Sequence, residues 1–181
     1  MKKRALSIQD LCLVGTITSI LIITAQISIP MPLGVPMTMQ TFTVMLAGIL
    51  LGPRKGTLTI IMYLLLGSIG LPVFSNFRGG LQCLMGPTGG FLWTFPIMSW
   101  LTGLGAKFLP RRKDIFLLML ITVNIINLLC GTVFFSILQK IPFSAAIATC
   151  LLPFIPATIL KMILATIAGT KIRKRLQSIL D

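Results

Sequence analysis

Six runs of apolar residues, separated by short polar, proline-rich or glycine-rich breaks, follow one another along the chain. Each run approaches the roughly 20 residues that a helix needs to cross the hydrocarbon core of a bilayer. We expect spanning helices over residues 8–29, 38–51, 56–71, 89–109, 115–138 and 144–169. The pattern predicts an all-α integral membrane protein with six transmembrane helices, which form a single transmembrane domain over residues 1–181.

The composition favours the same class of protein. Of the 181 residues, 55% are apolar and only 10% are charged. A soluble globule of this length needs more polar surface than these residues supply. We therefore expect membrane lipid to be a direct partner of the chain.

The basic residues predict how the chain is oriented. All but three of the 16 Lys and Arg residues cluster at the N-terminus, at the C-terminus or after every second predicted helix. The exceptions are Arg78, Lys140 and Lys161. Cytoplasmic loops of membrane proteins carry an excess of Lys and Arg, so we expect both termini to be cytoplasmic in a multi-pass protein of the cytoplasmic membrane.

Several chemistries are excluded or disfavoured by the residues that the chain lacks. It contains no His, only three carboxylates (Asp10, Asp114 and Asp181), no paired Cys motif and no phosphate-binding loop. The basic clusters flank apolar runs and lack the interleaved aromatic residues of a nucleic-acid platform. We expect no enzyme activity, no metal site, no cofactor and no nucleic-acid partner.

Residues 72–90, between the third and fourth predicted helices, form a glycine-rich segment with five of the 16 glycines. Irregular backbone beside a bilayer must fold into protein or line a watery cavity. On the predicted topology the segment is an outer loop. Its Arg78 offers a planar fork of donors suited to a carboxylate, and Asn76 offers an amide suited to a neutral cyclic urea or amide. The alternative is that Arg78 is a solvated loop residue.

Lys161 is the only basic residue deep within a predicted helix. An ammonium near the bilayer core costs roughly 2.5 kcal/mol or more, so it is expected to face the bundle interior or a cavity. Thr158 lies on the same face of that helix. The alternatives are a snorkelling lysine and a threonine that bonds its own backbone.

Other polar residues within the predicted helices leave two interpretations open. Gln40 and Tyr63 are either ligand contacts or partners in an interhelical hydrogen bond, and so are Asn124 and Asn127. In the first helix, Gly15 and Ser19 are four residues apart and form a shallow groove where another helix can approach closely.

Five motifs occur in an order and spacing that closely resemble the BioY family of biotin transporters. They are Pro36-Met-Thr-Met-Gln-Thr41, Leu46-Ala-Gly-Ile-Leu-Leu-Gly-Pro-Arg-Lys-Gly56, Tyr63-Leu-Leu-Leu-Gly67, Gly70-Leu-Pro-Val-Phe74 and Gly86-Pro-Thr-Gly-Gly-Phe91. The resemblance implies a six-helix, substrate-binding S component of an energy-coupling-factor (ECF) transporter. Such a component takes up biotin from outside and pairs with a transmembrane coupling protein and two ATPases. It also implies that Gly15 and Ser19 meet the coupling protein.

One motif departs from the family pattern. The last helix of family members usually carries Pro-Gly-Asp-x-x-Lys, whereas this chain has Pro156-Ala-Thr-Ile-Leu-Lys161. The lysine matches, but Thr158 replaces a carboxylate that would accept a hydrogen bond from biotin. The replacement also leaves Lys161 without a nearby counter-ion.

The resemblance implies a biotin pocket roofed by residues 72–90. Asn76, Thr158 and Lys161 would satisfy polar atoms of the ligand, and Arg78 or Lys161 would pair with its carboxylate. Its apolar ring would lie against aromatic residues such as Phe91 or Phe74. The expected substrate-binding set is completed by Thr88, Gly89, Gln40 and Tyr63. Other functions left open are an S component for another vitamin, a solitary biotin facilitator, and a membrane scaffold subunit without a ligand.

Overall fold

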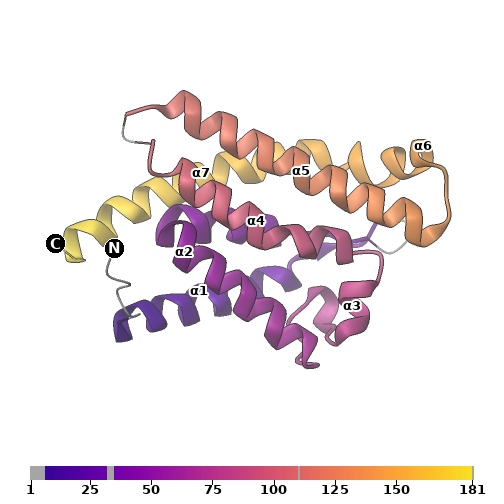
Figure 1. Ribbon diagram of the computed structural model, residues 1–181, viewed down its shortest axis with the longest axis horizontal. Coiled ribbons are helices and arrows are strands. Elements are labelled where there is room, and N and C mark those ends of the chain that lie inside the picture. The colour runs from indigo at the N-terminus through magenta and orange to yellow at the C-terminus, as the bar shows by residue number, and fades with distance from the viewer. Residues whose placement is uncertain (1–6, 32–34, 110, 181) are drawn as a thin grey trace.

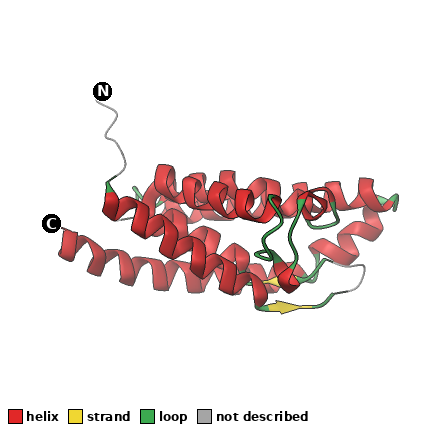
Figure 2. Cartoon of the chain, turned by 90° about the horizontal axis from the view of Figure 1, so that it is seen from below, coloured by secondary structure: helices red, strands yellow, loops and turns green. Residues whose placement is uncertain are grey.

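The computed structural model describes residues 7–31, 35–109 and 111–180, whose helices lie side by side along one long axis (Figure 1). In chain order the elements are α1 (Ile8–Gln26), β1 (Ser28–Ile29), β2 (Met37–Thr38), α2 (Gln40–Ser68), a 3-10 helix (Ser75–Phe77), α3 (Leu81–Met85), α4 (Gly89–Gly105), α5 (Lys113–Gln139), α6 (Phe143–Ala146), a π-helical turn (Ile147–Leu151) and α7 (Phe154–Leu180). Helix α1 begins and α7 ends at one end of the bundle, which we call the terminal end (Figure 1). Most of the connecting loops and the two short strands lie toward the other end, the loop end (Figure 2).

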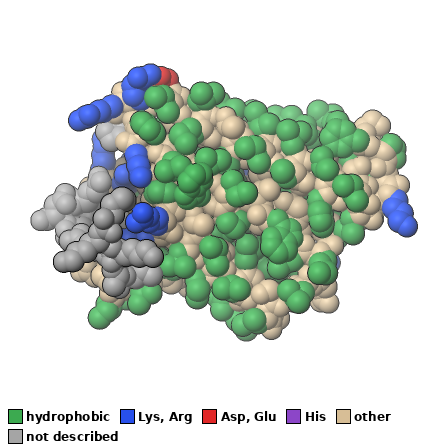
Figure 3. Space-filling view, viewed as in Figure 1, with side chains coloured by type: hydrophobic (Ala, Val, Ile, Leu, Met, Phe, Trp, Pro, Cys, Tyr) green, Lys and Arg blue, Asp and Glu red, His purple; other side chains and the backbone are tan. Residues whose placement is uncertain are grey.

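The helices have the length and composition of a multi-pass membrane protein. In the described part of the chain, α1, α2, α5 and residues Phe154–Arg175 of α7 are long and apolar enough to cross a bilayer. Hydrophobic side chains cover much of the outer surface between the two ends (Figure 3). This confirms the predicted all-α membrane bundle, whose six predicted helices correspond to α1, the two halves of α2, α4, α5 and α7.

Helix α2 is broken at Gly52, where φ is 74° and ψ is −178°. Only glycine adopts this conformation without strain, and Pro53 then begins the second half of the helix, where its missing N–H costs nothing. The predicted loop over residues 52–55 is therefore a break of one residue. The turn brings Lys55 into an ion pair with Asp10 of α1.

The turn in α2 packs tightly against α4 through small residues. A Cβ atom placed on Gly48 would lie 2.5 Å from the backbone oxygen of Ser99. One placed on Gly103 would lie 2.5 Å from the backbone nitrogen of Pro53. Small residues at such crossings let two membrane helices approach closely.

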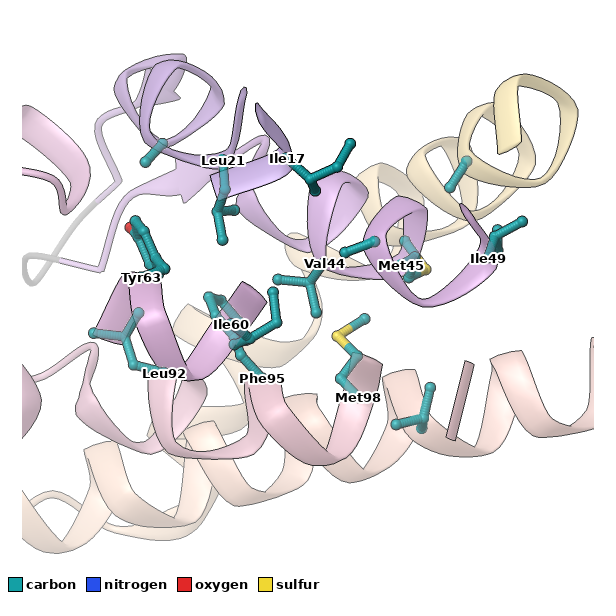
Figure 4. Close-up of a cluster of buried hydrophobic side chains, with 14 of the residues drawn as sticks. Ile17, Leu21, Val44, Met45, Ile49, Ile60, Tyr63, Leu92, Phe95 and Met98 are labelled. Carbon is teal, nitrogen blue, oxygen red and sulfur yellow. The ribbon is translucent and has the colours of Figure 1, made fainter. Parts of the chain in front are cut away.

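A buried apolar cluster joins α1, both halves of α2 and α4 (Figure 4). Tyr63 lies in this cluster, and its ring meets that of Phe74 edge-on, with centroids 5.4 Å apart. This core fixes the loop end of α2 and the start of the glycine-rich segment relative to each other.

Beyond the break at Gly52, the structure differs from the expected boundaries at further places. Helix α4 ends at Gly105 and not at residue 109, and α7 continues to Leu180 instead of ending at residue 169. The glycine-rich segment is partly ordered by the 3-10 helix and α3. The first helix ends at Gln26 because Ser28 and Ile29 pair with Thr38 and Met37 in an antiparallel ladder. The last predicted helix is divided into α6, the π-helical turn and α7, since Pro153 and Pro156 lack the N–H donors that a continuous helix requires.

Candidate functional site

A narrow cavity of about 40 Å³ lies toward the loop end, between the segment before α2 and helices α2, α4, α5 and α7. Its apolar lining includes Phe91, Leu92, Phe95, Leu128 and Phe154. Its polar side chains are Thr38, Gln40, Thr41, Ser75, Thr88, Asn127, Thr158 and Lys161. We call this space the inner cavity.

Lys161 is the only cationic side chain among the residues that line the inner cavity. Only 7% of it is exposed. Its Nζ donates hydrogen bonds to the Thr38 carbonyl (2.6 Å) and to the Thr41 hydroxyl (3.4 Å). An ammonium has three N–H donors, so one remains for a ligand.

No ion pair neutralises Lys161 within the described ranges. Asp10 pairs with Lys55, and Asp114 pairs with Arg112. Thr158, one turn before Lys161 on α7, lines the same cavity but carries no charge. The inner cavity therefore has a positive charge on an otherwise neutral lining.

A chain of side-chain hydrogen bonds fixes Gln40 at the cavity wall. Gln40 Nε2 donates to the Tyr63 hydroxyl (2.6 Å), which donates to the Val73 carbonyl (3.1 Å). Thr38 Oγ1 donates to Gln40 Oε1 (2.8 Å). Gln40 thus lines the cavity, whereas Tyr63 lies behind it and holds Gln40 in place.

Two aromatic rings of the cavity lining pack against each other. Phe91 of α4 and Phe154 of α7 are stacked, with centroids 6.2 Å apart and ring planes 16° apart. A Cβ on Gly131 would lie 2.2 Å from the Phe91 ring, so a glycine is needed at that point of α5. Asn127 Nδ2 donates to the Phe91 carbonyl (3.1 Å) and so fixes the start of α4 against α5.

A wider outer cavity of about 490 Å³ adjoins the inner one, because both are lined by Pro36, Ser75 and Thr88. Arg78 lines the outer cavity and is exposed. The two adjacent linings together extend from Arg78 in the glycine-rich segment to Lys161.

Two other residues of the predicted substrate-binding set lie outside both linings. Asn76 accepts a hydrogen bond from the Ser28 hydroxyl (2.9 Å) and has a left-handed backbone conformation. Gly89 is buried, and a Cβ there would lie 2.0 Å from the Leu84 carbonyl oxygen. The structure therefore brings together Gln40, Thr88, Phe91, Thr158 and Lys161 at the inner cavity.

Sequence reasoning left out several lining residues, including Phe95, Phe154 and Ser75. The sequence singles out Asn127 but leaves two roles open for it, a ligand contact or an interhelical hydrogen bond. The aromatic residues carried no signal of their own, since they occur among many apolar residues. Only their positions on the inward faces of helices distinguish them.

Cys83 lines the outer cavity, where burial raises the pKa of its thiol. Its Sγ donates a hydrogen bond to the Gly79 carbonyl (3.4 Å). At neutral pH this side chain is a thiol that packs in the loop, which disfavours a nucleophilic role.

Gly15 and Ser19 lie on an exposed face of α1. A Cβ on Gly15 would meet no atom within 4 Å, and Ser19 Oγ donates back to the Gly15 carbonyl (3.0 Å). Thr16 and Cys12 lie beside them, so a strip of small side chains covers this part of the surface.

Comparison with known proteins agrees over nearly the whole chain. The family model described as "BioY family" matches residues 1–178. The probable biotin transporter BioY of Pyrococcus horikoshii is 37% identical over 165 residues, which cover 91% of this chain and 96% of the relative. The biotin transporter BioY of Thermotoga maritima is 36% identical over 164 residues, covering 88% and 93% of the two chains.

A solved structure shares the fold. It is the crystal structure of the S-component for biotin from an ECF-type ABC transporter, with a TM-score of 0.84 and 28% sequence identity. The match covers 96% of this chain and 95% of that chain. The fold and the relatives are thus those of a membrane transport protein, not of an enzyme. The chain belongs to the BioY family.

Proposed function

We propose that this chain binds biotin and serves as the S component of an ECF-type transporter. The observation that carries the proposal is the buried ammonium of Lys161, which faces a cavity of aromatic and neutral polar side chains. Biotin has the matching parts: a bicyclic ring, a urea and a carboxylate. Support also comes from the relatives named as biotin transporters and from the fold shared with a biotin S-component.

Lys161 is the favoured partner for the carboxylate of biotin. A buried charge without a partner is costly, and a ligand carboxylate would neutralise it. Arg78 is exposed in the outer cavity and already hydrated, so it gains less from the same pairing. In this proposal Arg78 attracts the anion, and Lys161 holds it.

Neutral groups of the inner cavity would satisfy the urea. The Thr158 hydroxyl can accept a hydrogen bond from a urea N–H and donate one to its carbonyl oxygen. The Thr88 hydroxyl donates to the Cys83 carbonyl (3.4 Å) and so can only accept from a urea N–H. Phe91 and Phe154 present a flat apolar surface for the bicyclic ring. This mode of binding would use no cofactor or metal.

The outer cavity would open to the exterior. The basic residues support this topology because they gather at the terminal end, which places the glycine-rich segment outside (Figure 3). Both termini are then cytoplasmic.

The chain itself has no phosphate-binding loop for ATP hydrolysis. We therefore propose that a transmembrane coupling protein and two ATPase subunits drive release of the substrate. The exposed strip around Gly15 and Ser19 would be the face that meets the coupling protein, since its small residues allow another helix to approach closely.

The experiment that tests the function is uptake of radiolabelled biotin by cells that lack other biotin transporters. Cells that express this chain together with coupling proteins should accumulate biotin, and cells with the coupling proteins alone should not. Uptake that is equally fast without coupling proteins would indicate a solitary facilitator. No uptake, together with no saturable binding of biotin to the purified protein, would leave another vitamin or a scaffold role and would contradict the proposal.

A further inference from the structure

A cavity of about 660 Å³ lies at the terminal end, far along the bundle from the inner and outer cavities. It is formed by the segment after α4, the start of α5 and residues 166–174 of α7. It shares no lining residue with the proposed biotin site.

One side of this cavity is basic. Lys113, Arg173 and Lys174 line it, and no carboxylate does among the residues that the structure describes. Arg173 donates one hydrogen bond to the Ala106 carbonyl (2.8 Å), which orients its guanidinium and leaves its other donors available. The adjacent carboxylate, Asp114, pairs with Arg112 outside the lining.

The other side of the cavity is apolar. Phe116 is fully buried at its base, while Leu117 and Ile167 are about half exposed on α5 and α7. Both helices continue from here along the apolar surface of the bundle. A positive rim therefore adjoins apolar side chains, Leu117 and Ile167, that are exposed on the outer surface of the bundle, and we call this part of the lining the apolar groove.

We propose that this cavity binds one anionic phospholipid, with its phosphate at Lys113, Arg173 and Lys174 and an acyl chain along Leu117 and Ile167. Arginine binds phosphate through paired hydrogen bonds, and lysine adds a point charge. Basic pockets between transmembrane helices on the cytoplasmic side are a recognised form of lipid site. The apolar groove distinguishes a lipid from a free phosphate ion, which would not use it.

This inference goes beyond biotin transport and holds whether or not the chain binds biotin. The site lies in the leaflet at the terminal end, which is the cytoplasmic leaflet on the proposed topology. A lipid there would join the ends of α4, α5 and α7.

The test is native mass spectrometry of the delipidated protein in detergent with equal amounts of phosphatidylglycerol and phosphatidylcholine. The wild type should retain one phosphatidylglycerol per chain in roughly 100-fold preference to phosphatidylcholine, because three basic residues of about fivefold each act together. In the variant Lys113→Gln/Arg173→Gln/Lys174→Gln the preference should fall to near unity, since each basic residue near a membrane surface contributes roughly a fivefold preference for anionic lipid. Lys171→Gln is the matched control, because this exposed residue lies on the same helix outside the lining and should leave the preference unchanged.

Equal retention of the two lipids by the wild type would overturn the proposal. An unchanged preference in the triple variant would also overturn it. If that variant keeps its lipid preference but no longer binds a coupling protein, the basic residues form a protein contact and the lipid proposal is likewise wrong. If the triple variant does not fold, Lys113→Gln and Lys174→Gln are measured singly, since both side chains are exposed. Each should lower the preference severalfold, and no change in either would contradict the site. Complete displacement of the lipid by inorganic phosphate would show a small-anion site and would also overturn it.

Discussion

The Nζ atom of Lys161 donates a 2.6 Å hydrogen bond to the backbone carbonyl of Thr38 and so joins the first third of α7 to the residues that precede α2. The contact places a cation at the inner cavity without neutralising it, since a carbonyl group is only a dipole. A buried, unneutralised cation that faces the cavity should favour an anionic ligand over a neutral one.

Replacing Thr158 by Asp tests whether the lack of a counter-ion matters. A carboxylate one turn from Lys161 would pair with the ammonium and reduce the positive charge that a ligand encounters. In Thr158→Asp we expect the preference for biotin over the neutral biotinamide to fall severalfold. Competition binding measures this ratio, which does not depend on the absolute affinity. The isosteric Thr158→Val is the control and should keep the preference for biotin. An unchanged ratio in Thr158→Asp would contradict the claim that Lys161 has no counter-ion at the cavity.

The Tyr63 hydroxyl supports the site from behind. Tyr63→Phe removes its bonds with Gln40 and with the Val73 carbonyl but keeps the ring against Phe74. The Val73 carbonyl still accepts from Gln26 Nε2 (3.4 Å), but the buried Gln40 Nε2 loses its partner, which costs roughly 1–3 kcal/mol. We expect a lower melting temperature and weaker biotin binding, measured by thermal unfolding in detergent and by equilibrium dialysis. A variant with wild-type stability and affinity would show that the hydroxyl does not hold Gln40 in place.

The crossing of α2 and α4 has no room for a methyl group at Gly103. In Gly103→Ala the new Cβ would contact the backbone of Gly52 and Pro53 at about 2.5 Å, where no flexible side chain can give way. Overpacking of this kind costs typically 1–3 kcal/mol, so the melting temperature should fall.

Gly15→Ala is the matched control for that variant. It adds the same methyl group to a helix but into open space, and alanine is the better helix former by roughly 1 kcal/mol. Its melting temperature should stay the same or rise. Equal destabilisation of the two variants would refute the close crossing.

A bulky residue on the exposed face of α1 should separate binding from transport. Gly15→Leu adds a side chain where another helix is proposed to dock, far from both cavities. We expect the purified variant to bind biotin as the wild type does, while uptake in cells with the coupling proteins falls at least tenfold. Normal uptake by Gly15→Leu would mean that this face does not meet the coupling protein. The control is Ile61→Leu, at an exposed position of α2.

The sequence predicted the helices well because their signals are local. Apolar length identified the spans, and Gly52 with Pro53 marked the break in α2 that the structure places there. The sequence also placed Thr158 and Lys161 on the same face of a helix, because residues three positions apart are neighbours on a helix surface. Both side chains line the inner cavity.

Features that depend on contacts between distant segments could not be predicted in the same way. The partner of Asn76 is Ser28, from the loop after α1, and nothing near Asn76 in the sequence indicates that bond. Phe154 resembles any other apolar residue until α7 is packed against α4, where it stacks on Phe91. The direction in which Gln40 and Tyr63 point was open for the same reason, and it is settled by the packing of the two halves of α2.

Equilibrium binding of labelled biotin to the purified wild type and to Lys161→Gln tests the central claim most directly, with Lys171→Gln as a matched surface control. The wild type and Lys171→Gln should show saturable binding of one biotin per chain, while biotinamide competes only weakly. In Lys161→Gln the affinity for biotin should fall roughly 10- to 100-fold, as expected for a lost hydrogen bond to a charged group, and the preference over biotinamide should disappear. Saturable binding that is equally tight in Lys161→Gln, or no binding to the wild type, would contradict the account.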